Sequence, residues 1–325
     1  MWVLGISALV GNLFVIGWRF IPRARLQKKN RVESVLVSNL ALADFLMGIY
    51  MVLIASADMR YRGTYVYFAE DWQRSFLCKF AGFLSVLSSE ASVFFLTALS
   101  VDRFLCVVFP LHQIRLRRKS LMVTVACVWL STFAFSILPV VAFPIFGDAF
   151  YGRSGVCLAL PLTTELPQGW QYSIFLFIGV NLLSVSVIAL CYACIYVSVK
   201  RSSGRVQKSA GSKNNTEEIK FATRMAFLVF TNFFCWMPII TMGVLAQTGV
   251  FISGDIYAFT AVLILPLNSA LNPYLYTILT REVSLSSKKP ATGSSQNSGT
   301  PMQATTNVGS NGKASGQPSQ SEGMF

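Results

Sequence analysis

Seven stretches of predominantly apolar residues, each about 20 residues or longer, constrain this chain more than any other feature. They cover residues 2–21, 32–57, 76–109, 121–143, 170–199, 221–246 and 252–279. A stretch of that length crosses the roughly 30 Å hydrocarbon core of a bilayer. Because the bilayer offers no water to the backbone, a span must be a helix or belong to a closed barrel, and continuous runs lack the alternation of barrel strands. We therefore predict an all-α integral membrane protein, a seven-transmembrane helix bundle.

Composition and charge agree with a membrane protein. Only 13% of the 325 residues are charged, and the mean hydropathy is +0.55. The net charge of +13 would suggest nucleic-acid binding in a soluble protein. Here the Lys and Arg residues gather in short breaks after the first, third and fifth apolar runs, at residues 19–31, 115–119 and 200–213. The positive-inside rule places these loops in the cytoplasm, so we expect lipid rather than nucleic acid as a partner, a multi-pass location in the plasma membrane and a cytoplasmic C-terminus.

The composition changes abruptly near the end of the chain. Residues 284–325 are rich in Ser, Gly, Gln, Asn, Thr and Pro, and cannot bury enough apolar surface to order themselves. We expect residues 1–283 to form the seven-helix domain, with its first helix truncated at the outer end, and residues 284–325 to form a disordered cytoplasmic tail.

Catalytic and metal chemistry is poorly represented. The single histidine, His112, excludes a His-based metal cluster and a Ser-His-Asp relay. The seven cysteines are scattered without a CxxC pair. We therefore predict no enzyme activity, no catalytic residues and no resident cofactor, apart from the candidate sodium ion discussed below.

Polar and ionisable side chains inside the apolar runs are the candidate functional residues, because each is costly to place in a membrane. We single out such residues in the first, second, third, sixth and seventh runs. These residues are Asn12, Asp44, Glu90, Asp102 and Arg103, Asn232, Asn268 and Asn272.

Short motifs around these residues resemble, over all seven runs, the rhodopsin-family (class A) G-protein-coupled receptors. The motifs are Gly11-Asn12, Leu42-Ala-Asp44, Asp102-Arg103-Phe104, Trp129, Cys235-Trp-Met-Pro238 and Asn272-Pro273-Tyr274-Leu-Tyr276. Within that family, Glu90 in its Ser-rich segment, the missing proline in the fifth run and the sequence of residues 264–273 are similar to the leucine-rich-repeat-containing receptors. Residues 107–111, followed by Ile114-Arg115, resemble the relaxin-receptor branch.

The resemblance implies roles for particular residues. Asp102 and Glu218 would hold Arg103 in an ionic lock at the cytoplasmic end, where Arg103 would meet the G protein. The expected activation switch comprises Trp236, Pro238, Asn272, Pro273, Tyr276 and Tyr192. Pro238 and Pro273 each remove a backbone hydrogen bond and can bend their helices, so that a small shift near Trp236 becomes a larger one at the cytoplasmic end. The resemblance also implies a disulfide between Cys78 and Cys157, on the oxidising side of the membrane.

A polar network at mid-membrane is expected from Asp44, Ser92, Asn268, Ser269 and Asn272. One carboxylate with hydroxyl and amide oxygens suits an allosteric sodium ion, which prefers hard oxygen ligands. A hydrogen-bonded network between helices that contains water instead of the ion is an equal alternative. Asn232 departs from the pattern, because leucine-rich-repeat receptors usually carry an aspartate at this position.

The resulting functional hypothesis is a G-protein-coupled receptor for an extracellular relaxin- or insulin-like peptide or protein hormone, signalling through a heterotrimeric G protein and cyclic AMP, with arrestin binding at a phosphorylated tail. The hormone-capturing ectodomain is absent from this sequence, so we expect a fragment of a longer receptor. One alternative is a class A receptor without that ectodomain, which binds a peptide directly in the bundle. Another is an ion transporter lined by Asp44 and Glu90, although no inverted repeat is present.

Two ligand classes are excluded by single residues. Pro266 stands where a retinal-binding receptor needs its lysine, and the seventh run contains no lysine at all. Ser85 stands where an amine receptor needs an acid.

Overall fold

The structure is a computed structural model, and every regular element in its described part is helical. It describes residues 1–20, 31–109, 118–147, 150–159, 168–206 and 213–250. It also describes residues 252–275, apart from residues 254, 255, 257, 258, 261 and 265. The predicted boundary at residue 283 and the predicted tail therefore lie outside the described residues.

The helices follow the apolar runs closely. Their bounds are α1 Trp2–Phe20, α2 Arg31–Tyr61, α3 Tyr65–Arg74, α4 Phe76–Val108, α5 Arg118–Val141, α6 Phe143–Phe146, η2 Tyr151–Arg153, α7 Trp170–Ser173, η3 Ile174–Val180, α8 Asn181–Val206 and α9 Lys213–Gln247. The last apolar run, after α9, is also helical between residues 262 and 275 where it is described.

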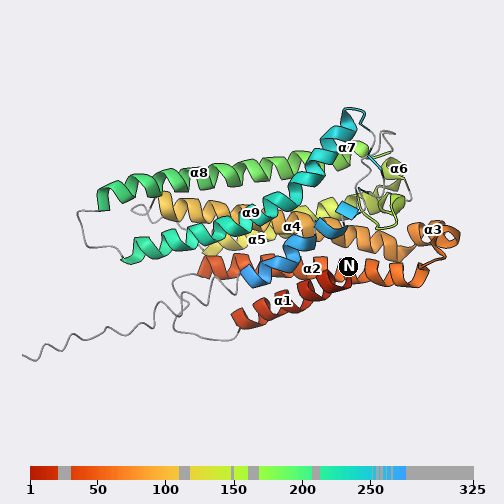
Figure 1. Ribbon diagram of the computed structural model, residues 1–325, viewed down its shortest axis with the longest axis horizontal. Helices are drawn as coiled ribbons and strands as arrows, with labels where there is room; N and C mark the ends of the chain where they lie inside the picture. The colour runs from red at the N-terminus through yellow and green to blue at the C-terminus, as the bar shows by residue number, and fades with distance from the viewer. Residues whose placement is uncertain are drawn as a thin grey trace, which may run out of the picture. The chain divides into compact units, whose positions relative to one another are not determined.

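The described helices account for all seven predicted membrane spans. Five of them are long and apolar enough to cross a bilayer, and two shorter apolar helices cover Trp2–Trp18 and Val262–Leu275. The long helices lie alongside one another (Figure 1), and many apolar side chains on the outside of α8, such as Leu183 and Leu190, are exposed. Apolar residues that face outward along a helix are expected where lipid is the solvent. The prediction of an all-α seven-helix membrane bundle is confirmed.

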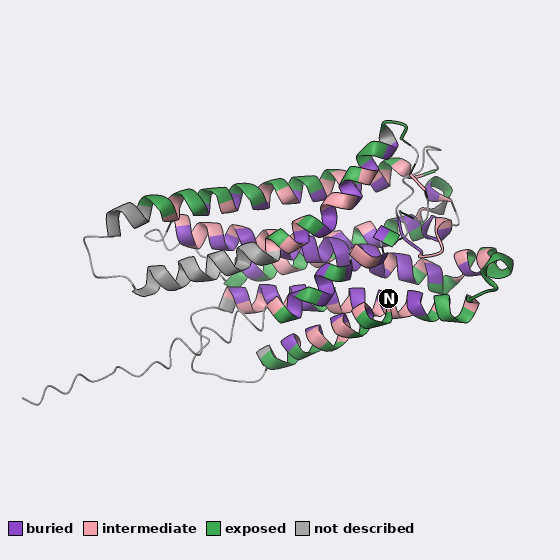
Figure 2. Ribbon diagram, in the orientation of Figure 1, coloured by how far each residue is buried: buried purple, intermediate pink, exposed green. Residues whose placement is uncertain are grey.

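The central helix of the bundle is α4. It packs against α2, α5, α8 and α9, and 20 of its 33 residues are buried. Figure 2 shows this burial along α4, in contrast to the largely exposed outer face of α8. Because α4 touches most of the other spans, polar groups on its surface can bond to several helices.

The structure differs from the sequence analysis at two places. The segment treated as an outer loop between the second and third spans contains the helix α3, and α2 extends to Tyr61 instead of ending near residue 57. The buried Trp72 anchors α3 to the rest of the protein, whereas most of its other residues are exposed. A helix of only 10 residues gives no long apolar run, and the apolar-run criterion therefore misses it.

The fifth span is not a uniform α-helix. It begins with the single turn α7, continues as the π-helix η3 and becomes α-helical only at α8. The Nδ2 group of Asn181 donates a hydrogen bond to the carbonyl oxygen of Leu176, five residues earlier, at 3.2 Å. π-Helical turns are rare and often occur at functional positions.

Two glycines allow α1 to approach its neighbours closely. A Cβ atom built on Gly11 would lie 2.8 Å from Cβ and Cγ of Pro273, and one built on Gly48 of α2 would lie 2.9 Å from Cγ of Leu9. Gly17, by contrast, has no atom within 4 Å of the same position. The contact between α1 and the last span therefore depends on the missing side chain at Gly11.

We predict that Gly11→Ala destabilises the protein and that Gly17→Ala does not. Overpacking typically costs about 1–3 kcal/mol, whereas alanine is favoured over glycine in a helix by about 1 kcal/mol. Thermal unfolding of both variants in lipid nanodiscs, followed with a thiol-reactive dye, measures the difference. Equal melting temperatures for the two variants would contradict the proposed close contact with Pro273.

Candidate functional site: buried polar clusters of the bundle

Asp44 is the centre of the largest polar cluster. It is completely buried on α2, and its Oδ1 atom accepts hydrogen bonds from the hydroxyls of Ser92, at 3.1 Å, and Ser269, at 2.8 Å. Its Oδ2 atom accepts a hydrogen bond from Nδ2 of Asn272 at 2.7 Å. The carboxylate thus ties α2 to α4 and to the last span, and the structure brings together four of the five residues predicted for this network.

Asn268, the fifth residue of the predicted network, is bonded elsewhere. Its Nδ2 group donates to Oδ1 of Asn232 on α9 at 2.8 Å, and no hydrogen bond joins it to Asp44 in the described structure. Successive residues of a helix point about 100° apart, so that Asn268 and its neighbour Ser269 face different helices. The sequence analysis predicted Asn268 as a member of the network around Asp44, and the hydrogen bond that the structure gives it is to Asn232 instead.

Two further amides connect helices near the same level. Nδ2 of the buried Asn12 donates to the carbonyl oxygens of Ala8, at 2.8 Å, and Ser269, at 3.0 Å, and thereby joins α1 to the last span. The indole of Trp129 on α5 donates to Oδ1 of Asn39 on α2 at 2.9 Å. Both Asn12 and Trp129 belong to the motifs singled out in the sequence.

At the other end of α4, Asp102 and Arg103 form a buried ion pair. Their side chains are 2% and 7% exposed, and Nη2 of Arg103 lies 2.6 Å from Oδ2 of Asp102. Tyr192 on α8 is near enough to interact with Ser100 and with the charge of Arg103. The predicted third partner, Glu218, lies in α9, but its side chain is outside the described part, as is the whole of Tyr276.

Trp236 and Pro238 lie in the middle of α9. Trp236 is 3% exposed, and its ring is stacked on Phe177 of η3 with the ring centres 6.4 Å apart. Pro238 is inside the same helix, where its ring removes a backbone hydrogen bond. The aromatic contact joins α9, two residues before Pro238, to the π-helical turn of the fifth span.

Glu90 forms a separate polar cluster with a residue that the sequence analysis missed. Glu90 is completely buried on α4, and its Oε1 atom accepts a hydrogen bond from Nδ2 of Asn181 at 3.1 Å. Asn181 is also completely buried. An amide inside the fifth apolar run is as costly as the others, and the same criterion would have found it if it had been applied to that run.

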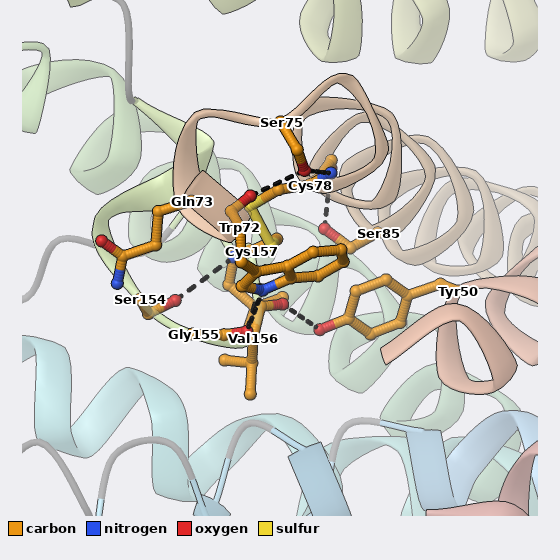
Figure 3. Close-up of a disulfide and its surroundings, with 12 residues drawn as sticks. Tyr50, Trp72, Gln73, Ser75, Cys78, Ser85, Ser154, Gly155, Val156 and Cys157 are labelled. Atoms are coloured by element: carbon orange, nitrogen blue, oxygen red, sulfur yellow. Dashed lines mark hydrogen bonds between the residues drawn. A yellow bond between two sulfur atoms is a disulfide. The ribbon is translucent and has the colours of Figure 1, made fainter. Parts of the chain in front are cut away.

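A disulfide between Cys78 and Cys157 joins the start of α4 to the second outer loop (Figure 3). It is the pair that the resemblance implied. Around it, the indole nitrogen of Trp72 donates to the carbonyl oxygen of Gly155, and the hydroxyl of Tyr50 donates to that of Val156, both at 2.8 Å. The first and second outer segments are therefore fastened together over the end of the bundle.

The second outer loop also fills the outer end of the bundle. Tyr151 is 2% exposed, and its hydroxyl donates to the carbonyl oxygen of Ser136 at 2.6 Å. Leu158 and Ala159 are 5% and 0% exposed, and Ser173 donates to the carbonyl oxygen of Ala159 at 2.8 Å. A small cavity remains beneath the loop, and it is lined by Met47, Tyr50, Ser85, Ser89, Leu158, Phe177 and Pro266.

These clusters join helices rather than assemble a reaction centre. No group of three or more His, Cys, Asp or Glu side chains that could hold a metal occurs among the described residues. What the clusters can do is fix the relative positions of spans through contacts that a helix movement would break. Apolar spans joined by buried polar contacts, with a disulfide-linked outer loop at one end, define a seven-helix integral membrane protein.

Comparison with known proteins identifies the family. The model of the 7 transmembrane receptor (rhodopsin family) matches residues 11–276. The chain therefore belongs to the rhodopsin family of seven-transmembrane receptors, which are multi-pass membrane receptors rather than enzymes.

Individual relatives agree with this assignment. The chain is 44% identical over 280 residues to the G-protein coupled receptor GRL101 of Lymnaea stagnalis, covering 86% of this chain and 24% of that protein. It is 37% identical over 281 residues to relaxin receptor 2 of Canis lupus familiaris, covering 86% of this chain and 37% of that receptor. The matched region is thus well under half the length of each of these relatives.

Among solved structures, squid rhodopsin has the same fold. The TM-score is 0.65 at 18% sequence identity, and the match covers 87% of this chain and 77% of the rhodopsin chain. At this identity the likeness concerns the fold alone.

We predict that the pair formed by Asn268 and Asn232 needs an acceptor on α9. Asn232→Leu would leave the buried Nδ2 group of Asn268 without a partner, which typically costs about 1–3 kcal/mol. Asn232→Asp keeps an acceptor oxygen and should therefore retain most of the stability. The measurement is thermal unfolding of both variants, and a leucine variant as stable as the aspartate variant would contradict this assignment.

Proposed function

We propose that this chain is the signalling bundle of a G-protein-coupled receptor for a relaxin- or insulin-like peptide or another protein hormone. The observation that carries the proposal is the similarity to relaxin receptor 2, which extends through 86% of the chain. The similarity to the G-protein coupled receptor GRL101 supports coupling to a heterotrimeric G protein. The family match favours this function over the alternative of an ion transporter.

The proposed mechanism is a shift between two arrangements of the helices, biased by a ligand that binds one of them better. In the resting arrangement Arg103 is held by Asp102. Movement of α9 about Pro238 would open the cytoplasmic end and release Arg103 toward the G protein. Trp236, in contact with Phe177, would report changes at the outer half of the bundle to that hinge.

The outer loop favours a large ligand over a small one. Leu158 and Ala159 are buried at the outer end of the bundle, and the cavity that the described residues form below them is small. A hormone captured by an extracellular domain would act by displacing or pressing on this loop. A peptide that binds in the bundle without such a domain is the second candidate, and it would first have to move the loop.

The remaining parts of the proposal concern the cytoplasmic side. The basic segments at residues 19–31, 115–119 and 200–213 would face the cytoplasm together with the C-terminus. We propose the stimulatory G protein and cyclic AMP as the pathway. Arrestin would bind the Ser-rich segment 284–325 after phosphorylation.

We predict that Arg103→Ala abolishes ligand-independent cyclic AMP production in cells that express the chain. The substitution removes the cation that would meet the G protein, so the signal should fall to the level of cells without the receptor. Arg74→Ala is the control, because Arg74 is an exposed arginine of α3, on the side assigned to the exterior. Surface expression of all three proteins must be matched.

A basal signal that persists in Arg103→Ala would contradict the proposed coupling role of this residue. Reporters for other G-protein classes, recorded in the same cells, separate a wrong choice of pathway from the absence of coupling. A signal with another reporter, sensitive to Arg103→Ala, would correct the pathway and leave the receptor function intact.

A sodium ion at Asp44 is a further part of the proposed regulation. Oδ1 of Asp44 and the hydroxyls of Ser92 and Ser269 offer three hard oxygens within one cluster. Asn272 points its Nδ2 group at Asp44, so in this arrangement it is a donor to the carboxylate rather than a ligand for a cation. The residues present therefore fit an ion held mainly by Asp44 and the two hydroxyls, which would favour the resting arrangement.

We predict that sodium chloride raises the melting temperature of the chain relative to choline chloride at the same ionic strength. A ligand at about ten times its Kd adds about 1.4 kcal/mol of stability. Asp44→Asn removes the charge that would hold the ion and should abolish the difference. If the two salts gave the same melting temperature for the unmodified chain, the cluster would be a hydrogen-bond network without a sodium site.

A further inference from the structure

Glu90 is a carboxyl group in an unusual position. It lies near the middle of α4, is completely buried and has buried neighbours on both sides in the sequence. In the described part of the chain it forms no ion pair with a Lys, Arg or His side chain. A lone ionised carboxylate in an apolar, membrane-embedded interior is strongly unfavourable.

The side chains of Glu90 and Asn181 each have one oxygen without a hydrogen-bond partner. Nδ2 of Asn181 donates both of its hydrogens, one to Oε1 of Glu90 at 3.1 Å and one to the carbonyl oxygen of Leu176 at 3.2 Å. Oε2 of Glu90 and Oδ1 of Asn181 are both buried and have no hydrogen-bond partner. Each is an acceptor when the carboxyl group is ionised, so these two atoms cannot then bond to one another.

A proton on Oε2 of Glu90 would remove the buried charge. It would also turn Oε2 into a donor for Oδ1 of Asn181, so that both buried oxygens gain a hydrogen bond. The acid and the amide then pair through two hydrogen bonds, N–H to Oε1 and O–H to Oδ1. A bridging water would satisfy both oxygens but leave the charge, and two oxygens are too few to coordinate a metal cation by themselves.

We propose that Glu90 is a neutral carboxylic acid that forms this two-hydrogen-bond pair with Asn181. The pair joins the centre of α4 to the first residue of α8. Because the same amide holds the carbonyl of Leu176, the pair also stabilises the π-helical turn η3, which carries Phe177 against Trp236. Glu90 is then a positioning residue for the fifth span, not a counter-ion for a cationic ligand.

The ionisable groups around Glu90 agree with a neutral acid. Tyr172 of α7 is close enough to sense a charge on Glu90, and its hydroxyl donates to the carbonyl oxygen of Phe135 on α5. On the side of α2 the nearest acidic cluster is that of Asp44, whose partner Ser92 lies two residues after Glu90. Neither group supplies a positive charge that would favour the ionised form.

Infrared spectroscopy tests the proposal directly. The spectrum of the chain in lipid nanodiscs at neutral pH is compared with that of Glu90→Gln, with glutamate carrying a ¹³C label in the carboxyl group. We expect a protonated-acid carbonyl band that the label shifts, that moves to lower frequency in D₂O, and that is missing from Glu90→Gln. The glutamate label separates this band from that of Asp44. A difference spectrum with only carboxylate bands would overturn the proposal.

Thermal unfolding provides a second, independent readout. Glutamine preserves both hydrogen bonds to Asn181 as an amide pair, so Glu90→Gln should melt at the temperature of the unmodified chain. Glu90→Leu and Asn181→Leu each break the pair and should lower the melting temperature. The double leucine variant should lose much less than the sum of the two, because the residues form one unit.

A Glu90→Gln variant as unstable as Glu90→Leu would overturn the proposal, and so would additive losses in the double variant. If Glu90→Gln does not fold, the labelled band and its shift in D₂O in the unmodified chain decide alone. Neither measurement depends on the hormone or the G protein, so failure here leaves the proposed function untouched.

Discussion

The lipid environment imposes one constraint on this protein from which most of its interior follows. A polar side chain inside a span cannot turn to water and must therefore find its partner on another helix. α4 meets this requirement for much of the bundle: Ser92 reaches Asp44 on α2, and Glu90 reaches Asn181 at the start of α8. Each such contact specifies which helix lies beside which, something that apolar packing alone does only weakly when lipid is equally apolar.

The polar clusters lie at different levels along α4. The disulfide at Cys78 and the buried outer loop close one end, Glu90 lies below them, and the ion pair of Asp102 with Arg103 lies at the opposite end. α4 therefore carries contacts to other elements along most of its length. The stacking of Phe177 on Trp236 adds a contact between η3 and the proline-containing α9.

Much of the fold could be predicted because span length and hydropathy are local properties of the sequence. The motifs also led to the prediction of a polar network at mid-membrane, and four of its residues converge in the structure: Asp44, Ser92, Ser269 and Asn272. The partner of Asn268 could not be predicted in this way, because it depends on the rotation of the last span against α9. α3 was missed for a different reason: its 10 residues are too few to form a long apolar run, and its contact through Trp72 is with Gly155, far away in the sequence.

The π-helical start of the fifth span shows how a local irregularity and a distant acid depend on each other. In this wide turn the carbonyl of Leu176 accepts a hydrogen bond from the side chain of Asn181, which uses one of its two amide hydrogens. The other hydrogen and the amide oxygen then need a group with one acceptor and one donor, which a protonated carboxyl group offers and an ionised one does not. The buried glutamate of the third run and the π-helical start of the fifth are, in this structure, two parts of one contact.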